Sequence, residues 1–337
     1  MKKKVRYVFV RVALFVTAVT VFFVGCQRSV GDEAEGEGAD KPDKIRLDYA
    51  YYSPVSLVLK EKGWAEEVFA EEGIDVEFVL SLGSNKALEF LNSNSVDFGS
   101  SAGAAALIAK SNGTPIETVY IYSKPEWTAL VTNADSDIQH VDDLKGKKVA
   151  ATIGTDPYIF LLRALNEEGL SAEDVEVVPL QHPDGATALS KGEVDAWAGL
   201  DPHMAQLELE EGAHLFYRNP EFNTYGFLSV RSEFKEKYPQ YVEKVIELYE
   251  KARKWTLDHP ADATRILADS AQLNKDVAEI EMGRNDFSDP VPGAVHREAI
   301  KAAAEVLQSE GIIGADVDID SLSHELIQPS FAEKVVQ

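Results

Sequence analysis

The stretch that decides the fold is LNSNSVDFGSSAGAAALIA, residues 91–109. Residues Val96 to Phe98 predict a short buried strand that ends in a tight turn at Gly99. Ser100 and Ser101 then stand where a helix N-cap belongs, and the alanine-rich run behind them is a strong helix former. Because small residues cover little of the first helical turn, we expect its amide groups to attract a small anion. The alternative is that small residues only let this helix pack closely on a sheet.

A second copy of the same unit occurs about a hundred residues later. Val96-Asp97 and Val194-Asp195 each follow a leucine by five residues, and each precedes a short apolar run. A helix-start signal comes next, Ser100-Ser101 in the first copy and Asp201-Pro202 in the second. We therefore expect two α/β lobes that present helix starts at the carboxyl ends of their strands, where ligands bind in open α/β sheets.

The N-terminus predicts export. Residues 1–25 combine a basic start with an apolar run that is short for a membrane span, so we expect a signal peptide, with an uncleaved anchor helix as the alternative. The end of this run, Phe23-Val24-Gly25-Cys26, resembles the bacterial lipobox, with Phe23 where leucine is usual. Cys26 is the only cysteine, which excludes an internal disulfide and predicts a lipid anchor. Residues 26–44 are polar and acidic and predict a tether that holds the folded part outside the cytoplasm.

The charge balance limits the partners. The chain carries 33 basic and 57 acidic residues, a net charge of −24, and cleavage after residue 25 would leave −29. So acidic a protein repels nucleic acid, and we expect no such partner. An anionic ligand would have to be held by local dipoles and hydrogen bonds.

The order of patterns predicts two lobes joined by a hinge. Strand and helix patterns alternate over residues 45–132, which predicts a mostly parallel sheet flanked by helices in the first lobe. Residues 133–229 repeat the alternation and predict the second lobe. Residues 230–337 read as successive helices that pack back on the first lobe. The expected joints lie near Asn133 and Tyr225.

Five helix starts can face one cleft between these lobes, and aromatic residues beside them can contact an organic ligand. The helix starts are Ser53-Pro54, Ser84-Asn85, Ser100-Ser101, Thr155-Asp156-Pro157 and Asp201-Pro202. The candidate ligand-binding residues are Tyr52, Ser53, Ser84, Asn85, Ser100, Ser101, Trp127, Thr155, Asp156, Trp197 and Asp201. For each one the alternative is an ordinary cap or a core position. Metal-ligand spacings and nucleophile motifs are absent from the sequence, so we expect no metal, no cofactor and no catalytic residue. His182-Pro183-Asp184 is expected to form a loop.

Four segments, in this order and spacing, resemble the periplasmic solute-binding proteins of ABC importers in the aliphatic sulfonate, nitrate and taurine group. They are VDFGSSAGAA (96–105), VDDLKGKKVA (141–150), GTDPYIFLLRALNEEGL (154–170) and VDAWAGLDPH (194–203). The resemblance covers residues 45 to about 325 and implies a two-lobed, type II-like periplasmic-binding-protein fold with the anion in the cleft. It implies ligand positions at Ser53, Asn85, Ser101, Thr155 and Asp201, with Trp197 beside them. Ala104-Ala105-Ala106 stands where the group often has Thr-Pro-Pro.

The resemblance implies a monomeric, lipid-anchored receptor that binds a small organic sulfonate, an alkanesulfonate or taurine, and delivers it to an ABC permease in the membrane. A receptor for nitrate, bicarbonate or a pyrimidine (thiamine) precursor is the near alternative. Pyrimidine-synthesising enzymes share the fold, but they carry a cysteine-rich motif, and this chain has no cysteine after Cys26. A purely sensory binding module is a third possibility.

Overall fold

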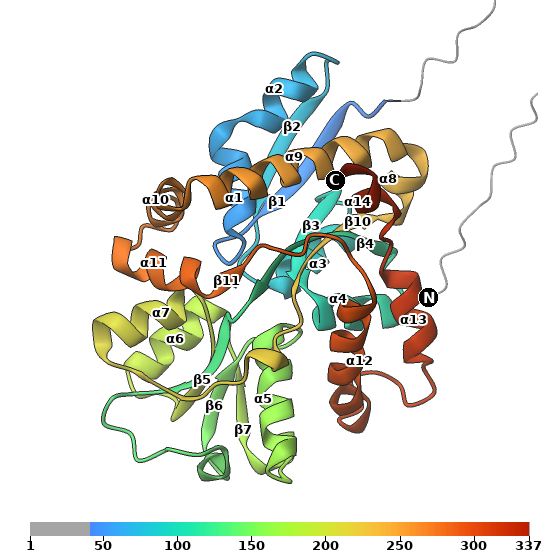
Figure 1. Cartoon of the computed structure of the whole chain (residues 1–337). Coiled ribbons are helices and arrows are strands. Elements are labelled where there is room, and N and C mark those ends of the chain that lie inside the picture. The colour runs from blue at the N-terminus through green and yellow to red at the C-terminus, as the bar shows by residue number, and fades with distance from the viewer. Residues whose placement is uncertain (1–40, 337) are drawn as a thin grey trace, which may run out of the picture. The chain divides into compact units, whose positions relative to one another are not determined.

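The computed structural model describes residues 41–336. The predicted signal peptide, Cys26 and most of the predicted tether lie outside the described residues. The described chain is built on two separate sheets, each with helices against it (Figure 1).

The first sheet has six strands in the order β11-β4-β10-β3-β1-β2. Its strands are β1 (Lys44–Tyr49), β2 (Asp75–Leu80), β3 (Phe98–Ala102), β4 (Ile116–Pro125), β10 (Gly226–Arg231) and β11 (Asn285–Asp286). Its helices are α1 (Pro54–Lys62), α2 (Trp64–Ala70), α3 (Ser84–Asn92) and α4 (Gly103–Ser111), and later α8 (Ser232–Lys237), α9 (Pro239–Asp258), α10 (Pro260–Ala271) and α11 (Lys275–Gly283). β1 is parallel to β2 and β3, whereas β10 is antiparallel to both of its neighbours.

The second sheet has five strands in the order β7-β6-β8-β5-β9. They are β5 (Thr128–Thr132), β6 (Lys148–Ala151), β7 (Glu176–Pro179), β8 (Ala196–Leu200) and β9 (His214–Tyr217), with helices α5 (Asp156–Glu167), α6 (His182–Ser190) and α7 (His203–Gln206). Separate apolar clusters cover its two faces: Leu130 packs on the α5 side, and its neighbours Ala129 and Val131 pack on the α6 side. Burial on both faces explains why these strands read as continuous apolar runs.

Strand pairing moves the expected lobe boundaries. β5 pairs with β8 and β9, so residues 128–132 belong to the second lobe and not to the first. β10 pairs with β3 and β4 from Gly226 onward, so the return to the first lobe comes before residue 230. The chain therefore crosses between the lobes at residues 126–127 and again at 218–225. Each crossing leads into a strand that runs antiparallel to its neighbours, which a largely parallel pattern did not predict.

The central stretch differs from expectation at the strand end. β3 continues through Ser100 and Ser101 to Ala102, and α4 begins at Gly103. The reason is β10, which comes from more than a hundred residues away and extends the ladder by pairing Phe227 with Ser101 and Gly226 with Ala102. The two serines are therefore strand residues and not helix caps.

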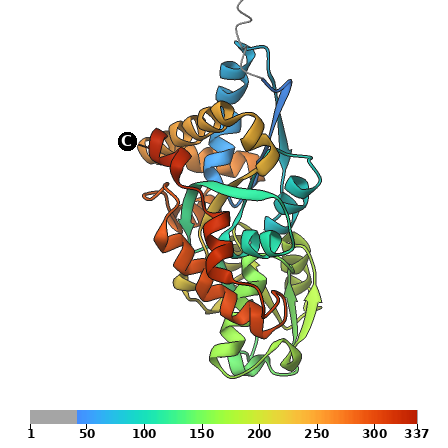
Figure 2. The same cartoon turned by 90° about the vertical axis from the view of Figure 1, so that its right-hand side faces the viewer.

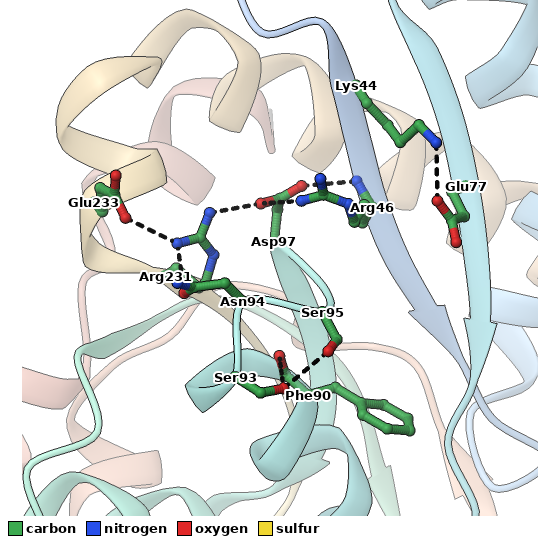
Figure 3. Close-up of polar contacts among 10 residues, drawn as sticks. All are labelled: Lys44, Arg46, Glu77, Phe90, Ser93, Asn94, Ser95, Asp97, Arg231 and Glu233. Atoms are coloured by element: carbon green, nitrogen blue, oxygen red, sulfur yellow. Dashed lines mark hydrogen bonds and ion pairs between the residues drawn. The ribbon is translucent and has the colours of Figure 1, made fainter.

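The repeated Val-Asp unit has one structural role in both lobes. Asp97, just before β3, accepts a hydrogen bond from the amide of Arg46 at 2.8 Å, and Asp195, just before β8, accepts one from the amide of Lys148 at 2.8 Å. Asp97 also pairs with the Arg231 guanidinium at 2.8 Å, so it lies between two arginines (Figure 3). Each carboxylate fixes the start of its strand against a parallel neighbour.

The C-terminal helices α12 (Ala294–Ser309), α13 (Ile319–Leu326) and α14 (Ser330–Val335) return along both lobes (Figure 2). α12 contacts α4 of the first lobe and α5 of the second, while α14 packs on α9. Between residues 41 and 336, none of the helices combines the length and the apolar character that crossing a membrane requires.

Candidate functional site

Six strand ends bring the candidate side chains to the facing edges of the two sheets. In the first lobe, Ser53 follows β1, Ser84 follows β2, and Ser101 is the next-to-last residue of β3. In the second lobe Thr155, His182 and Asp201 follow β6, β7 and β8. Ser53 is the N-cap of α1, and Thr155 is the N-cap of α5. The proline after Ser53 and the Asp-Pro pair after Thr155 predicted these two helix starts.

The lobes touch at these ends around a small pocket of about 10 Å³, which is room for about one water molecule. The first lobe lines it with Tyr51, Tyr52, Ser81 and Leu82, and the second lobe with His182, Leu200, Asp201, Pro202 and His203. Gly83 lies at the contact: a β-carbon added there would stand 2.8 Å from Asn85 Oδ1 and 3.0 Å from His182 Nε2. A β-carbon on Gly154 would lie 3.8 Å from that of Asn85. Asn85 and Asp201 are therefore brought to one interlobe site, together with Tyr52.

Two buried hydroxyl groups at this edge have no hydrogen-bond partner within residues 41–336, Ser53 Oγ and Ser101 Oγ; we call them the open hydroxyls. A buried polar atom normally finds a partner, so such atoms need an explanation. Ser84 Oγ accepts from the Ala102 amide at 2.9 Å and keeps its own proton for another acceptor. Thr155 Oγ1 donates to the Thr152 carbonyl at 2.6 Å, so this hydroxyl can only accept from a ligand.

Ser100 was expected to bind a ligand, but its hydrogen-bond donors are used within the first lobe. Its amide and its hydroxyl both donate to Asp48, at 2.8 Å each, and Ser81 Oγ donates to the same carboxylate at 2.8 Å. Burial raises the pKa of Asp48 to about 7 in spite of these three donors. The donors of Ser100 are thus committed to the core of the first lobe.

The N-terminus of α4 is also covered, which corrects the expectation of a bare one. The Gly103 amide donates to the carbonyls of Thr224 and Tyr225 at 3.2 Å, and the Ala104 amide donates to Thr224 Oγ1 at 2.9 Å. This partner comes from the second crossing segment and could not be foreseen from the local sequence.

Two of the three expected aromatic residues cluster, and the third does not. Tyr52 and Trp127 pack edge-to-face with ring centroids 5.9 Å apart, and Tyr122 joins them at 6.5 Å from Trp127. Trp197 instead lies in the core of the second lobe, where its Nε1 would be 2.7 Å from a β-carbon on Gly185. Strand parity turns it toward α6, so it does not line the pocket.

Asp156 fastens both crossing segments. Its carboxylate accepts from Trp127 Nε1 at 3.0 Å in the first segment, and from the amide and hydroxyl of Thr224 at 2.9 and 2.6 Å in the second. Burial raises its pKa, and these donors oppose that effect. With both oxygens engaged, Asp156 acts at the joint and does not face a ligand.

Asp201 faces the pocket but is held by Arg284, which no sequence signal had marked. Arg284 follows α11 of the first lobe, and its guanidinium contacts Asp201 Oδ1 at 3.0 Å and also pairs with Glu208. Burial raises the pKa of Asp201 to about 6, and Arg284 counteracts this. Glu281, fully buried beside them, has its pKa raised well above its usual value by burial and then by the charge of Asp201.

His182 was missed by sequence reasoning. It begins α6 rather than lying in a loop, and its ring is buried in the interlobe pocket. A signal did exist: proline follows it directly after a strand, as in the Thr155-Asp156-Pro157 and Asp201-Pro202 starts. Across the described range 41–336, no group of three His, Cys, Asp or Glu side chains is arranged to hold a metal ion.

Comparison with known proteins places this geometry in context. Residues 54–263 match the family described as NMT1/THI5 like. The chain is 28% identical over 297 residues to the "Putative aliphatic sulfonates-binding protein" of Bacillus subtilis (strain 168), covering 87% of both chains. It is 27% identical over 246 residues to the Saccharomyces cerevisiae 4-amino-5-hydroxymethyl-2-methylpyrimidine phosphate synthase THI13, covering 68% of this chain and 70% of that one.

Solved structures share the fold. The alkanesulfonate-binding protein SsuA from Xanthomonas axonopodis pv. citri, bound to MOPS, superposes with a TM-score of 0.78 at 24% identity over 86% of this chain and 99% of that one. The periplasmic aliphatic sulphonate binding protein SsuA from Escherichia coli gives 0.73 at 25% identity, over 86% and 93%. These similarities confirm the predicted two-lobed α/β periplasmic-binding-protein fold. They also agree with the prediction of a binding protein rather than an enzyme.

Proposed function

The chain belongs to the NMT1/THI5-like family, and from this premise we propose that it is the extracytoplasmic binding protein of an ABC importer for a small organic sulfonate. The similarity to named sulfonate-binding proteins over most of the chain supports this assignment. An ABC permease in the membrane is the proposed partner, and the receptor works as a monomer.

The observation that carries the proposal is the pair of open hydroxyls. Ser53 and Ser101 each place a buried hydroxyl donor at a strand end of the first lobe. Donors to an ionised acceptor make short hydrogen bonds about twice as strong as neutral ones. We propose that the sulfonate oxygens accept hydrogen bonds from Ser53, Ser84 and Ser101 and from the Asn85 amide. Thr155 and Asp201 of the second lobe are proposed to contact the same ligand from the opposite side.

We propose that the aromatic side chains of this site contact the organic part of the ligand. Tyr52 and Trp127 present ring surface beside these donors, which favours an organic anion over nitrate or bicarbonate. Closure of the lobes would bury the ligand and shift the protein from open to closed forms.

Lipid anchoring of Cys26 remains part of the proposal, and it has its own test. Mass spectrometry of the protein expressed in bacteria should find an acylated Cys26 at the mature N-terminus. Cys26→Ala should release the protein from the membrane fraction. An unmodified Cys26, or an unchanged membrane fraction, would contradict the anchor and leave the sulfonate proposal standing.

Thermal unfolding of the mature protein tests the ligand class. The arms are ethanesulfonate, taurine, MOPS, nitrate, bicarbonate and 4-amino-5-hydroxymethyl-2-methylpyrimidine. A ligand at about a hundredfold excess over its dissociation constant adds roughly 2.7 kcal/mol, a rise of several degrees in Tm. Stabilisation by a sulfonate supports the proposal. Stabilisation by the pyrimidine or by nitrate alone would replace it.

A further inference from the structure

His182 lies where the two lobes meet, and one nitrogen of its imidazole is available to a ligand. The ring is 1% exposed and lines the interlobe pocket with Tyr52 and Asp201. Its Nε2 has no hydrogen-bond partner among the side chains and backbone that the structure describes. It faces the Gly83 turn of the opposite lobe, where a β-carbon would come within 3.0 Å of it.

The proton on this ring can be assigned from its neighbour. His182 Nδ1 lies 3.1 Å from Thr152 Oγ1, and that hydroxyl donates its single proton to the Leu180 carbonyl at 2.7 Å. Thr152 therefore has only lone pairs left for the ring, and Nδ1 must be the donor. In a neutral imidazole the other nitrogen, Nε2, is then an acceptor.

The ring stays neutral in this environment. Burial, together with the neighbouring His203, lowers the pKa of His182 to about 3. The polar groups that face it are Tyr51, Tyr52, Ser81, Asp201 and His203 in the pocket and Asn85 beyond Gly83. Of these only Asp201 carries a formal charge, and Arg284 pairs with it.

We propose that His182 Nε2 accepts a hydrogen bond from a donor on the organic part of the ligand, so that the preferred sulfonate carries a hydroxyl or a protonated amine. The inference rests on the proposed function and adds the substrate class. In this arrangement the first lobe supplies donors to the sulfonate, and the second lobe supplies an acceptor nitrogen with the Asp201 carboxylate beside it. A bare alkyl chain would leave Nε2 buried and without a partner, which is costly.

Three sulfonates of equal chain length test this: ethanesulfonate, 2-hydroxyethanesulfonate and taurine. Titration calorimetry on the mature protein should show the hydroxy or amino compound binding at least about tenfold more tightly than ethanesulfonate. Equal affinities would overturn the inference while leaving the sulfonate proposal intact. Absence of binding by all three would overturn the sulfonate proposal, and the inference with it.

Two matched variants separate the acceptor role from packing. His182→Asn keeps a donor near the Nδ1 position but has no atom at Nε2, so the preference should fall below about threefold. His182→Gln reaches the Nε2 position with an amide oxygen and should keep the preference. A preference that survives in His182→Asn would overturn the inference. So would a ¹⁵N spectrum of the free protein that shows the ring proton on Nε2.

Discussion

The Arg284 guanidinium bonds Asp201 at 3.0 Å and thereby joins the two lobes through a buried ion pair. Arg284 lies between α11 and β11 of the first lobe, whereas Asp201 directly follows β8 of the second. The side chains are 10% and 1% exposed, so water screens this pair little. The pair therefore belongs to the closed arrangement of the lobes.

Replacing Arg284 with methionine should destabilise this arrangement. It leaves Asp201 buried with only the Ala205 amide as a donor, and breaking a buried pair from one side costs about 3–5 kcal/mol. The loss should be largest at about pH 8 and smaller at about pH 5, because burial raises the pKa of Asp201 to about 6 and the carboxyl is protonated at the lower pH. Urea unfolding at both pH values measures it.

The matched control is Arg265→Met. Arg265 pairs with Asp262 on the surface, where the side chains are 61% and 52% exposed, and such pairs contribute less than about 1 kcal/mol. Equal losses in the two variants would mean that the Arg284 pair does not stabilise the closed lobes.

Two adjacent serines should have opposite effects. Ser101→Ala removes an open hydroxyl, so ligand affinity should fall about tenfold to a hundredfold, while the free energy of unfolding changes by less than about 0.5 kcal/mol. Ser100→Ala removes one donor to Asp48, which should cost about 1–3 kcal/mol of stability with less effect on affinity. Calorimetry and urea unfolding of both variants measure the contrast. The same pattern in both would argue against the site as assigned.

Gly83→Ala should hinder lobe closure without unfolding the protein. The new methyl group would stand 2.8 Å from Asn85 Oδ1 and 3.0 Å from His182 Nε2, closer than side chains normally approach. We expect a loss of affinity of about tenfold or more. Gly283→Ala is the control, since no atom lies within 4 Å of its added carbon. Wild-type affinity in Gly83→Ala would show that the lobes close without this contact.

The free energy of unfolding should depend on pH through Asp48. Its pKa is about 7 in the folded protein against its ordinary value of 3.8, so between these values the folded state binds the extra proton. Stability then falls as pH rises from about 4 to about 7, by at most about 1.4 kcal/mol per unit, and is level above that. Asp48→Asn should remove this contribution to the slope, whereas the contribution of Asp201, whose pKa is also raised, should remain. An unchanged difference between variant and wild type across the window would contradict it.

Local signals predicted what depends on neighbours in sequence. The Ser53-Pro54 and Asp156-Pro157 starts gave the helix N-termini of α1 and α5, and the two Val-Asp units marked equivalent strands. The alternation of strands and helices likewise gave the two-lobed fold. These features follow from backbone preferences over a few residues.

What the sequence did not show depends on distant partners. Ser100 is held by Asp48, 52 residues away, and the α4 terminus is covered by Thr224, 120 residues from Ala104. Trp197 could have faced either side, because both faces of its strand are apolar. The sequence His182-Pro183-Asp184 is typical of a loop, and only the tertiary structure shows that His182 lies against the opposite lobe. Tertiary contacts of this kind decide which polar groups stay free for a ligand.

Asp156 accepts hydrogen bonds from both chain segments that pass between the lobes. We expect a movement of the lobes to leave these hydrogen bonds intact, because all of them lie at the crossing segments themselves. The stiffness of the receptor is therefore set at a buried point that the cargo does not touch. We expect substitutions of Asp156 to alter the rates at which the protein captures and releases its ligand. The residues that select the ligand could then change without any change at this joint.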